Sequence, residues 1–272
     1  MTAAACLRPG DHVGAAFDSA DAFTETTIAV AERAIAASAR MLIFPGGAGR
    51  DDPAGYRRLC DRRSPVVAAA GDQIGLGDSR QVQWAPGRLD PEHLTQAYTA
   101  ATRQAVADGF TGLWVSVDMT WAAGADPDAL IAFEADSSAL FTAGELTAVC
   151  QYDTRVFARP HVTAAGQAHP AGLANRSPLR HRLTEEGRTM ALSGEVDLAN
   201  TTAFAALLRR LRPGHTLDLT ATTFLDLRAL AAIARRQTEL IDLKVRTTPS
   251  QCGLLDLIRD AGGSAPAGGR LQ

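Results

Sequence analysis

The 272-residue sequence predicts an α/β protein, in which a doubly wound, mostly parallel sheet is followed by a smaller α/β domain. Short apolar runs alternate with amphipathic stretches between residues 11 and 153, which is typical of strands joined by crossover helices. The chain is also longer than one ordinary domain needs, and a stretch rich in proline and small polar residues interrupts it. We therefore expect a first domain at 1–169, a linker at 170–178, and a second domain at 179–272 that ends in a flexible tail.

Five apolar runs are the strand candidates of the first domain: 12–17, 41–44, 66–70, 112–119 and 145–153. Between the first two runs, apolar residues recur at helical spacing from Phe23 to Ala34. Either Asp18 or Ser19 is placed to cap the exposed amides at the start of this helix.

Two further helices are marked by their ends. Asp90 can cap the first of them, Pro91 suits its first position, and Gly109 stops it. The other begins at 126–127, runs to residue 141 and is ended by Gly144.

The second domain begins with two extended segments, 179–183 and 188–192, which flank the turn TEEG as a hairpin would. Asn200 is placed to cap the next helix, which Pro213 and Gly214 terminate. The remaining elements are a strand at 215–220, a helix after Asp226, a strand at 241–247 and a helix from residue 250.

Composition excludes several classes of protein. No apolar run reaches the 18 or so residues that span a bilayer, and no basic-then-apolar signal pattern opens the chain, so we expect a cytoplasmic protein with no membrane partner. The four cysteines lie far apart and form no CxxC pair, so we expect them to be free thiols in a reducing compartment. Residues 1–170 carry 13 basic and 20 acidic residues, and the rest carry 14 and 10. The second part therefore has a small excess of basic residues, but they form no basic run, so no direct nucleic-acid partner is expected.

Signatures of catalysis are incomplete. Asp118 ends a strand, as a magnesium-holding carboxylate does in nucleotide hydrolases, but DSADAF stands where a phosphate-binding loop would need glycines and a lysine. PGGAG at 45–49 follows a strand and could bind an anion, yet it lacks the lysine. No GxSxG motif occurs, Cys150 is best explained as a core thiol, and His12 and His93 are too isolated to predict a metal site. We expect no enzyme, no catalytic residues and no cofactor.

Four ordered motifs, LRPGDHVGAAFDS, PGRLDPEHL, ADGFTGLWVSVDMTWA and CQYDTRVF, resemble the MEDS family over about residues 7–170. This sensory domain is named for methanogens, methylotrophs and the dichloromethane regulator DcmR. The resemblance implies a RecA-like scaffold without a working phosphate loop, which senses small molecules, including organic ones. The ligand-binding candidates that it implies are Asp11, His12, Asp118, Trp121, Gln151, Tyr152, Asp153 and Arg155. Two alternatives stay open: His12 could tie down the N-terminal segment, and Asp153 and Arg155 could form an ion pair that shapes a turn.

The motifs LSGEVDLANTTAF and HTLDLTATTFLDLRAL resemble the STAS family of anti-sigma factor antagonists over about residues 179–263. The resemblance implies a small α/β domain with a mixed sheet that binds an anti-sigma factor kinase. Such domains are commonly switched by phosphorylation of a serine in a DS[ST]G turn, where this chain reads DLRA with Arg228 at the serine position. Arginine has no hydroxyl, so we expect this switch to be absent, whether Arg228 is a selected residue or the result of drift in a surface turn. The implied partner-binding residues are Asn200, Thr201, Thr202, Asp226, Leu227, Arg228, Ala229 and Leu230.

Together these resemblances predict a bacterial signalling regulator in which ligand binding by the first domain controls a STAS module. Its partner would be an anti-sigma factor kinase or another STAS protein, and a homodimer stays open. One alternative is a nucleotide-binding or hydrolysing RecA-like protein that uses Asp118 and the 45–49 segment. The other is a ligand-free scaffold of a stress-signalling complex, whose first domain would fill its pocket with its own side chains.

Overall fold

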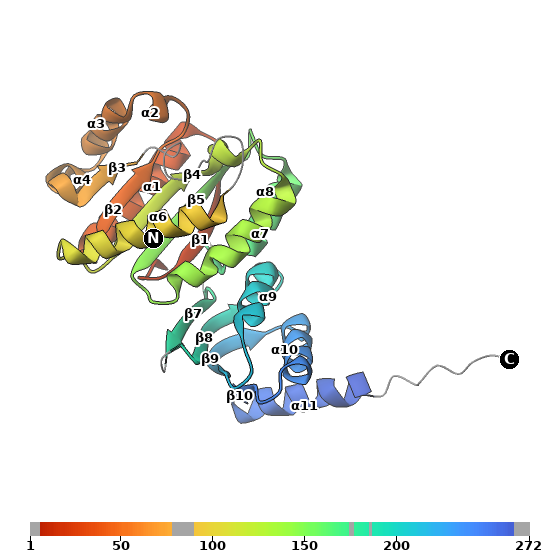
Figure 1. Ribbon diagram of the computed structural model, residues 1–272. Coiled ribbons are helices and arrows are strands. Elements are labelled where there is room, and N and C mark those ends of the chain that lie inside the picture. The colour runs from red at the N-terminus through yellow and green to blue at the C-terminus, as the bar shows by residue number, and fades with distance from the viewer. Residues whose placement is uncertain (1–5, 78–89, 174–176, 185–186, 264–272) are drawn as a thin grey trace.

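The computed structural model describes residues 6–77, 90–173, 177–184 and 187–263. Within these residues the protein has the predicted α/β fold: a six-stranded, all-parallel sheet, followed by a smaller four-stranded mixed sheet with helices (Figure 1). The predicted tail, the middle of the linker and the centre of the TEEG turn lie outside the described residues. No helix among the described residues is both long enough and apolar enough to cross a membrane.

The first sheet runs in the order β3 (Ile74–Leu76), β2 (Arg40–Phe44), β4 (Leu113–Asp118), β5 (Leu146–Asp153), β1 (His12–Phe17), β6 (Ala171–Gly172). Every residue of the central strands β4 and β5 is buried. Such burial is expected of parallel strands covered on both faces, and it explains why these strands are unbroken apolar runs in the sequence. The predicted linker is not wholly a linker, because its residues Ala171 and Gly172 form β6 and pair with β1.

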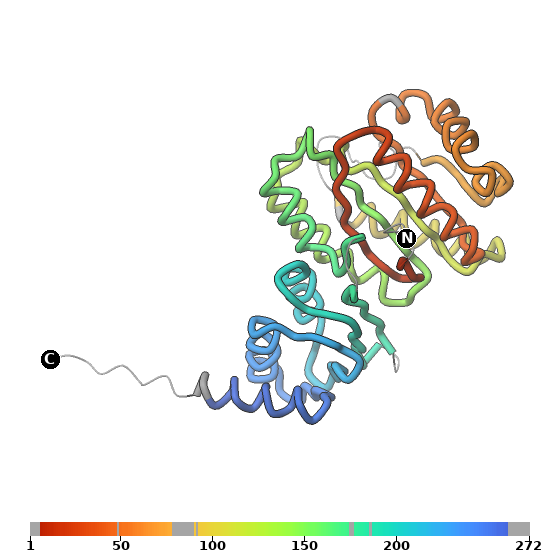
Figure 2. The backbone as a smooth tube through the Cα atoms, turned by 180° about the vertical axis from the view of Figure 1, so that it is seen from behind, coloured from red at the N-terminus to blue at the C-terminus, as the bar shows by residue number. Residues whose placement is uncertain are grey.

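Helices cover both faces of this sheet, as the doubly wound prediction requires (Figures 1 and 2). One face packs against α1 (Ala20–Ala36), α3 (Pro53–Arg63) and α4 (Pro65–Ala69). The other face packs against α6 (Pro91–Ala107), α7 (Pro127–Ser137) and α8 (Arg159–Ala168). The short helices α2 (Gly47–Asp51), η2 (Gly71–Gln73), η3 (Met119–Ala122) and η4 (Ser138–Phe141) lie in the connections.

Helix starts follow the capping residues of the sequence. Ser19, rather than Asp18, caps α1 and accepts a hydrogen bond from the Ala22 amide at 3.2 Å. Asp90 and Asp126 cap α6 and α7 as predicted.

The strand predicted at residues 66–70 is wrong, because this segment is helix α4. The apolar residues of this segment, taken alone, are typical of a buried strand. Ser64 accepts from the Val67 amide and Pro65 occupies the first turn, and both features start a helix.

The second sheet runs in the order β10 (Lys244–Arg246), β9 (Thr216–Leu225), β8 (Thr189–Val196), β7 (Arg180–Thr184). Strands β7 and β8 form the predicted antiparallel hairpin, and the other neighbours are parallel. Helices α9 (Thr201–Arg210), α10 (Leu227–Glu239) and α11 (Pro249–Gly263) complete this C-terminal domain. Its core includes Phe204, Leu217 and Ile233.

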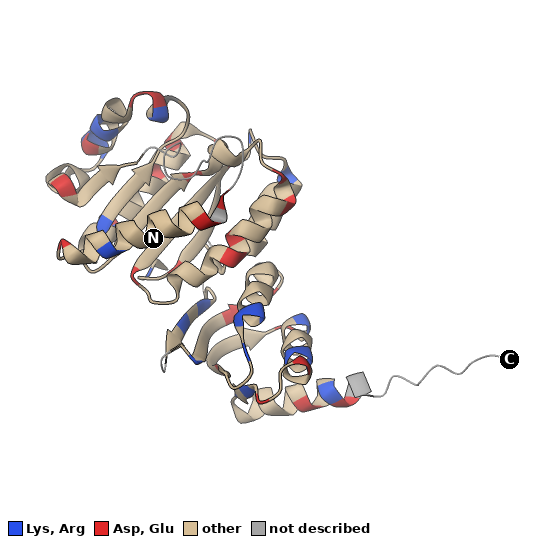
Figure 3. Ribbon diagram, in the orientation of Figure 1, with Lys and Arg blue, Asp and Glu red and all other residues tan. Residues whose placement is uncertain are grey.

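Helix α9 packs against the first domain through a contact of small side chains in which Ala206 meets Ala135 of α7 and Ala168 of α8. Ion pairs also join the two domains, and in each an arginine of the C-terminal domain meets an aspartate of the first domain: Arg180 meets Asp11, and Arg209 meets Asp136. Figure 3 shows basic residues on β7 and α9 at this side of the C-terminal domain. The net acidic first part of the sequence and the net basic second part therefore contact each other at an interface.

Candidate functional site

The carboxyl ends of β1, β2, β4 and β5 surround a cavity of about 440 Å³. Open parallel sheets bind ligands at this edge, and the volume is within the range of small-molecule sites. We call it the edge cavity. Its polar lining includes side chains at the ends of these strands and in the segments that follow them: Arg50, Asp118, Thr120, Asp153 and Arg155.

Two carboxylates of the edge cavity are held differently. Asp153 forms a two-pronged ion pair with Arg155, with oxygen–nitrogen distances of 2.8 and 2.6 Å, and the hydrogen bonds from Arg155 lower the pKa of Asp153. This pair is the turn-shaping one left open by the sequence. Burial raises the pKa of Asp118, whose carboxylate also accepts from the Thr120 amide at 2.8 Å. Among the described residues, the buried Nε of Arg50 has no hydrogen-bond partner.

A glycine makes room for the Asp118 carboxylate. A Cβ atom added at Gly46 would overlap the side-chain oxygen of Asp118, so the predicted glycine-rich segment allows the backbone to approach this carboxylate closely. The segment thus contributes to the edge cavity, although it has no lysine.

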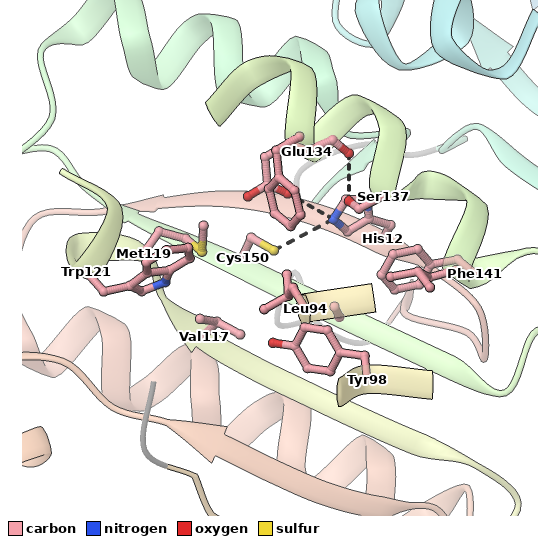
Figure 4. Close-up of a pocket in the computed structure, with 13 residues that line it drawn as sticks. His12, Leu94, Tyr98, Val117, Met119, Trp121, Glu134, Ser137, Phe141 and Cys150 are labelled. Carbon is pink, nitrogen blue, oxygen red and sulfur yellow. Dashed lines mark hydrogen bonds and ion pairs between the residues drawn. The ribbon is translucent and has the colours of Figure 1, made fainter. Parts of the chain in front are cut away.

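A second group of polar side chains lies inside the first domain, between the sheet and helices α7 and α8 (Figure 4). We call it the buried cluster: His12 of β1, Glu134 of α7, Cys150 of β5, and His169 at the end of α8. None of these side chains is more than 7% exposed. One carboxylate oxygen, Glu134 Oε2, lies 3.3 Å from Nε2 of each histidine, and Cys150 Sγ lies 3.7 Å from His12 Nε2.

The surroundings fix three members of the buried cluster. The Tyr152 hydroxyl donates to Glu134 Oε1 at 2.7 Å, and His169 Nδ1 donates to the Ala165 carbonyl at 2.7 Å. The His12 ring stacks on Phe141, with ring centroids 4.3 Å apart.

The pKa values follow from burial and mutual attraction. Burial and the repulsion of His169 lower the pKa of His12 to about 4. Burial alone would raise the pKa of Glu134, but the attraction of His169 and hydrogen bonds from both histidines hold that pKa well below its usual range. Burial, followed by the charge of Glu134, raises the pKa of the Cys150 thiol.

An apolar pocket with room for about 30 Å³, roughly one water molecule, adjoins the buried cluster. Its walls are mainly aromatic and aliphatic and include Tyr98, Met119, Trp121 and Phe133 (Figure 4).

The eight ligand-binding candidates of the sequence do not form one site. Asp118, Asp153 and Arg155 line the edge cavity. His12 and Trp121 line the apolar pocket, and Tyr152 bonds to Glu134 beside it. Gln151 points elsewhere and donates to Thr27 and Ser116, while Asp11 pairs with Arg180 of the C-terminal domain.

Sequence reasoning missed Arg50, Glu134 and His169. Only Glu134 carried a signal: it follows Leu130 and Phe133 within an apolar helix, where an acidic residue is rarely buried without partners. His169 and Arg50 gave none, because their partners are distant in the sequence.

The partner-binding candidates of the C-terminal domain also separate. Leu227 is 71% exposed and Arg228 is exposed, whereas Ala229 and Leu230 are buried. Asp226 caps α10 and accepts from the Ala229 amide at 2.7 Å. Exposed Phe224 lies in the strand just before this turn, so an apolar surface flanks the start of α10.

The candidates at the start of α9 lie nearer the first domain. Asn200 occupies the cap position of α9, but its side chain makes no cap bond. It is 2% exposed and donates to the carbonyls of Pro170 and Glu195 at 3.3 and 2.9 Å. Thr201 and Thr202 are half-buried. Asn200 thus joins the two domains and is not displayed to a partner.

A family model described as MEDS: MEthanogen/methylotroph, DcmR Sensory domain matches residues 11–170. The match contains both the edge cavity and the buried cluster, while the C-terminal domain lies outside it. No curated protein matches the chain. Because the family model covers more than half of the chain, this protein belongs to the MEDS family, the sensory domain of methanogens and methylotrophs.

Proposed function

We propose that this protein is a cytoplasmic bacterial signalling regulator in which the MEDS domain binds a small organic ligand and so controls the C-terminal domain. The observation that carries the proposal is the edge cavity, because α/β proteins commonly bind small molecules in pockets of this size, about 440 Å³, at the carboxyl ends of parallel strands. A ligand-free scaffold would fill this space with its own side chains.

The charges of the edge cavity favour an anionic ligand. Arg155 and Asp153 neutralise each other, and the Asp118 carboxylate accepts from the Thr120 amide. Arg50 is left as the cation whose buried Nε has no hydrogen-bond partner among the described residues. An organic carboxylate or phosphate would satisfy that donor, since buried donors without partners are costly.

The C-terminal domain is proposed to act as a STAS module. Its mixed sheet and the motifs of its sequence support this role, and Arg228 in place of the phosphorylated serine supports a switch that needs no phosphorylation. Its partner would be an anti-sigma factor kinase or another STAS protein, which would contact the exposed residues at the start of α10. For ligand binding to act as the switch, the ligand must prefer one domain arrangement, since equal affinity for two states shifts neither.

Thermal unfolding of the full chain with a panel of short-chain organic carboxylates and phosphates tests ligand binding. A ligand at 100 times its dissociation constant stabilises the folded state by about 2.7 kcal/mol. Arg50→Ala should remove this stabilisation. Arg235→Ala should retain it, because Arg235 is an exposed residue of α10. If no compound stabilises the protein, or if both variants respond alike, the edge cavity is not the ligand site.

A second measurement tests the output. The protein is used to capture its partner from extracts of the native cell, with and without the stabilising ligand. Partner capture that changes with ligand concentration supports control of the C-terminal domain, whereas capture independent of ligand rejects it.

A further inference from the structure

The buried cluster has the donor set of a metal site. Nitrogen, sulfur and oxygen donors from His12, Glu134, Cys150 and His169 all lie within 4.8 Å of one another. Figure 4 shows the first three of these side chains. They come from four separate elements, β1, α7, β5 and the end of α8, so the fold itself brings them together.

Three of the six distances between these donors match the edges of a tetrahedron around zinc. Ligand atoms that lie 2.0 to 2.3 Å from a tetrahedral zinc ion are about 3.3 to 3.7 Å from one another. Glu134 Oε2 lies 3.3 Å from Nε2 of each histidine, and Cys150 Sγ lies 3.7 Å from His12 Nε2. The remaining donor pairs lie within 4.8 Å of one another.

Hydrogen bonding leaves an acceptor of His169 facing an acceptor of Glu134. A carbonyl can only accept, so His169 Nδ1 carries the hydrogen that bonds to Ala165, and in the neutral ring Nε2 is then a lone-pair acceptor. This lone pair faces Glu134 Oε2 at 3.3 Å inside the core. Two buried acceptors at this distance need a positive charge between them, which is either a proton or a metal ion.

The outer contacts are those that orient metal ligands. A ligating histidine commonly donates its other ring nitrogen to a carbonyl, and a ligating carboxylate is itself hydrogen-bonded. His169 has the Ala165 carbonyl, and Glu134 has the Tyr152 hydroxyl on Oε1, which leaves Oε2 for the ion. His12 is held instead by its stack on Phe141.

We propose that the buried cluster binds one divalent first-row transition-metal ion, with zinc as the best match. Two imidazoles and a thiolate favour such a borderline ion over magnesium or calcium, which prefer oxygen ligands. With Glu134 and Cys150 each ionised, a dipositive ion makes the site neutral, which a buried site requires. Four protein donors leave no open position, so this is a structural or regulatory site.

The site lies against the interface of the two domains. Three of its members are next to interface residues in the sequence: His12 follows Asp11, Glu134 precedes Ala135, and His169 precedes Pro170. We therefore expect the metal to stabilise the contact between the domains.

The test uses the full chain, stripped with a chelator and titrated with Co²⁺ as a spectroscopic stand-in for zinc. We expect one ion per chain, a sulfur-to-cobalt charge-transfer band and the intense visible bands of tetrahedral cobalt, all displaced by Zn²⁺. Cys150→Ser should abolish the charge-transfer band. The matched control Cys60→Ser, which removes a buried cysteine of α3 outside the cluster, should leave the spectrum unchanged.

Variants that keep the fold make the result decisive. Tyr152→Phe removes only the outer hydroxyl and should weaken binding by about 10- to 100-fold, with the charge-transfer band retained at saturation. The proposal is overturned if the stripped protein shows no tetrahedral cobalt bands, if Cys60→Ser removes the sulfur band, or if Tyr152→Phe binds with unchanged affinity. The first of these results would assign the cluster a proton between His169 and Glu134 instead. None of these readouts depends on the edge cavity.

Discussion

The ion pair between Arg180 and Asp11 gives the sharpest test of how the two domains are joined. Arg180 Nε and Nη2 lie 2.8 and 3.0 Å from the two oxygens of the Asp11 carboxylate. Asp11 is 3% exposed, and the Arg180 side chain is 19% exposed. Arg180→Ala would leave a buried carboxylate whose remaining hydrogen bond comes from the Arg8 amide at 2.9 Å.

Removing one partner of a buried ion pair costs 3–5 kcal/mol, and the partial exposure of Arg180 places this pair at the lower end, about 3 kcal/mol. For a chain of this size that corresponds to a fall in Tm of roughly 6 to 12 °C. Thermal unfolding measures the loss, and hydrogen exchange of the Asp11 and Pro170 regions shows whether the domain contact opens.

Two variants act as controls. Arg209→Ala breaks a second interdomain pair, whose side chains are 60% and 65% exposed, and should cost less than about 1 kcal/mol. Asp11→Asn combined with Arg180→Ala should recover part of the loss, because no unpaired charge stays buried. Equal effects of Arg180→Ala and Arg209→Ala would refute the reasoning that burial makes the Asp11 pair structural. A role of Asp11 in ligand binding would then regain support.

Three further predictions concern pH, the edge cavity and the partner surface. Burial lowers the pKa of His181 to about 4. The contribution of neutral His181 to stability is therefore complete above pH 6.5 and is lost, by about 3 kcal/mol, as the pH falls toward 4. His181→Gln should flatten this part of the curve of stability against pH, and an unchanged curve would contradict the prediction. Gly46→Ala should displace the Asp118 carboxylate and reduce ligand-induced stabilisation in thermal unfolding, and full retention would show that the ligand lies elsewhere. Leu227→Lys should abolish partner capture with Tm almost unchanged, since Leu227 is 71% exposed. Asp226→Asn, by contrast, should keep the side-chain cap of α10. Partner capture by the Leu227→Lys variant would exclude this surface.

The sequence by itself determined the fold class, because its evidence is local. Buried parallel strands require continuous apolar runs, and capping residues mark the starts of α1, α6 and α7. Where the local evidence was ambiguous, the prediction was wrong. The apolar residues at 66–70 suit a strand or a short helix equally, and the serine and proline before them start a helix.

Only the tertiary structure decided which polar residues meet. The eight ligand-binding candidates are divided among the edge cavity, the buried cluster with its adjoining apolar pocket, the far face of the sheet and the domain interface. His12 and His169 are 157 positions apart, yet both contact one oxygen of Glu134, because parallel pairing and the packing of α7 and α8 set their positions. Residue spacing along a chain records the neighbours within one helix or strand. Contacts between elements depend on sheet order and helix packing, which no local pattern contains.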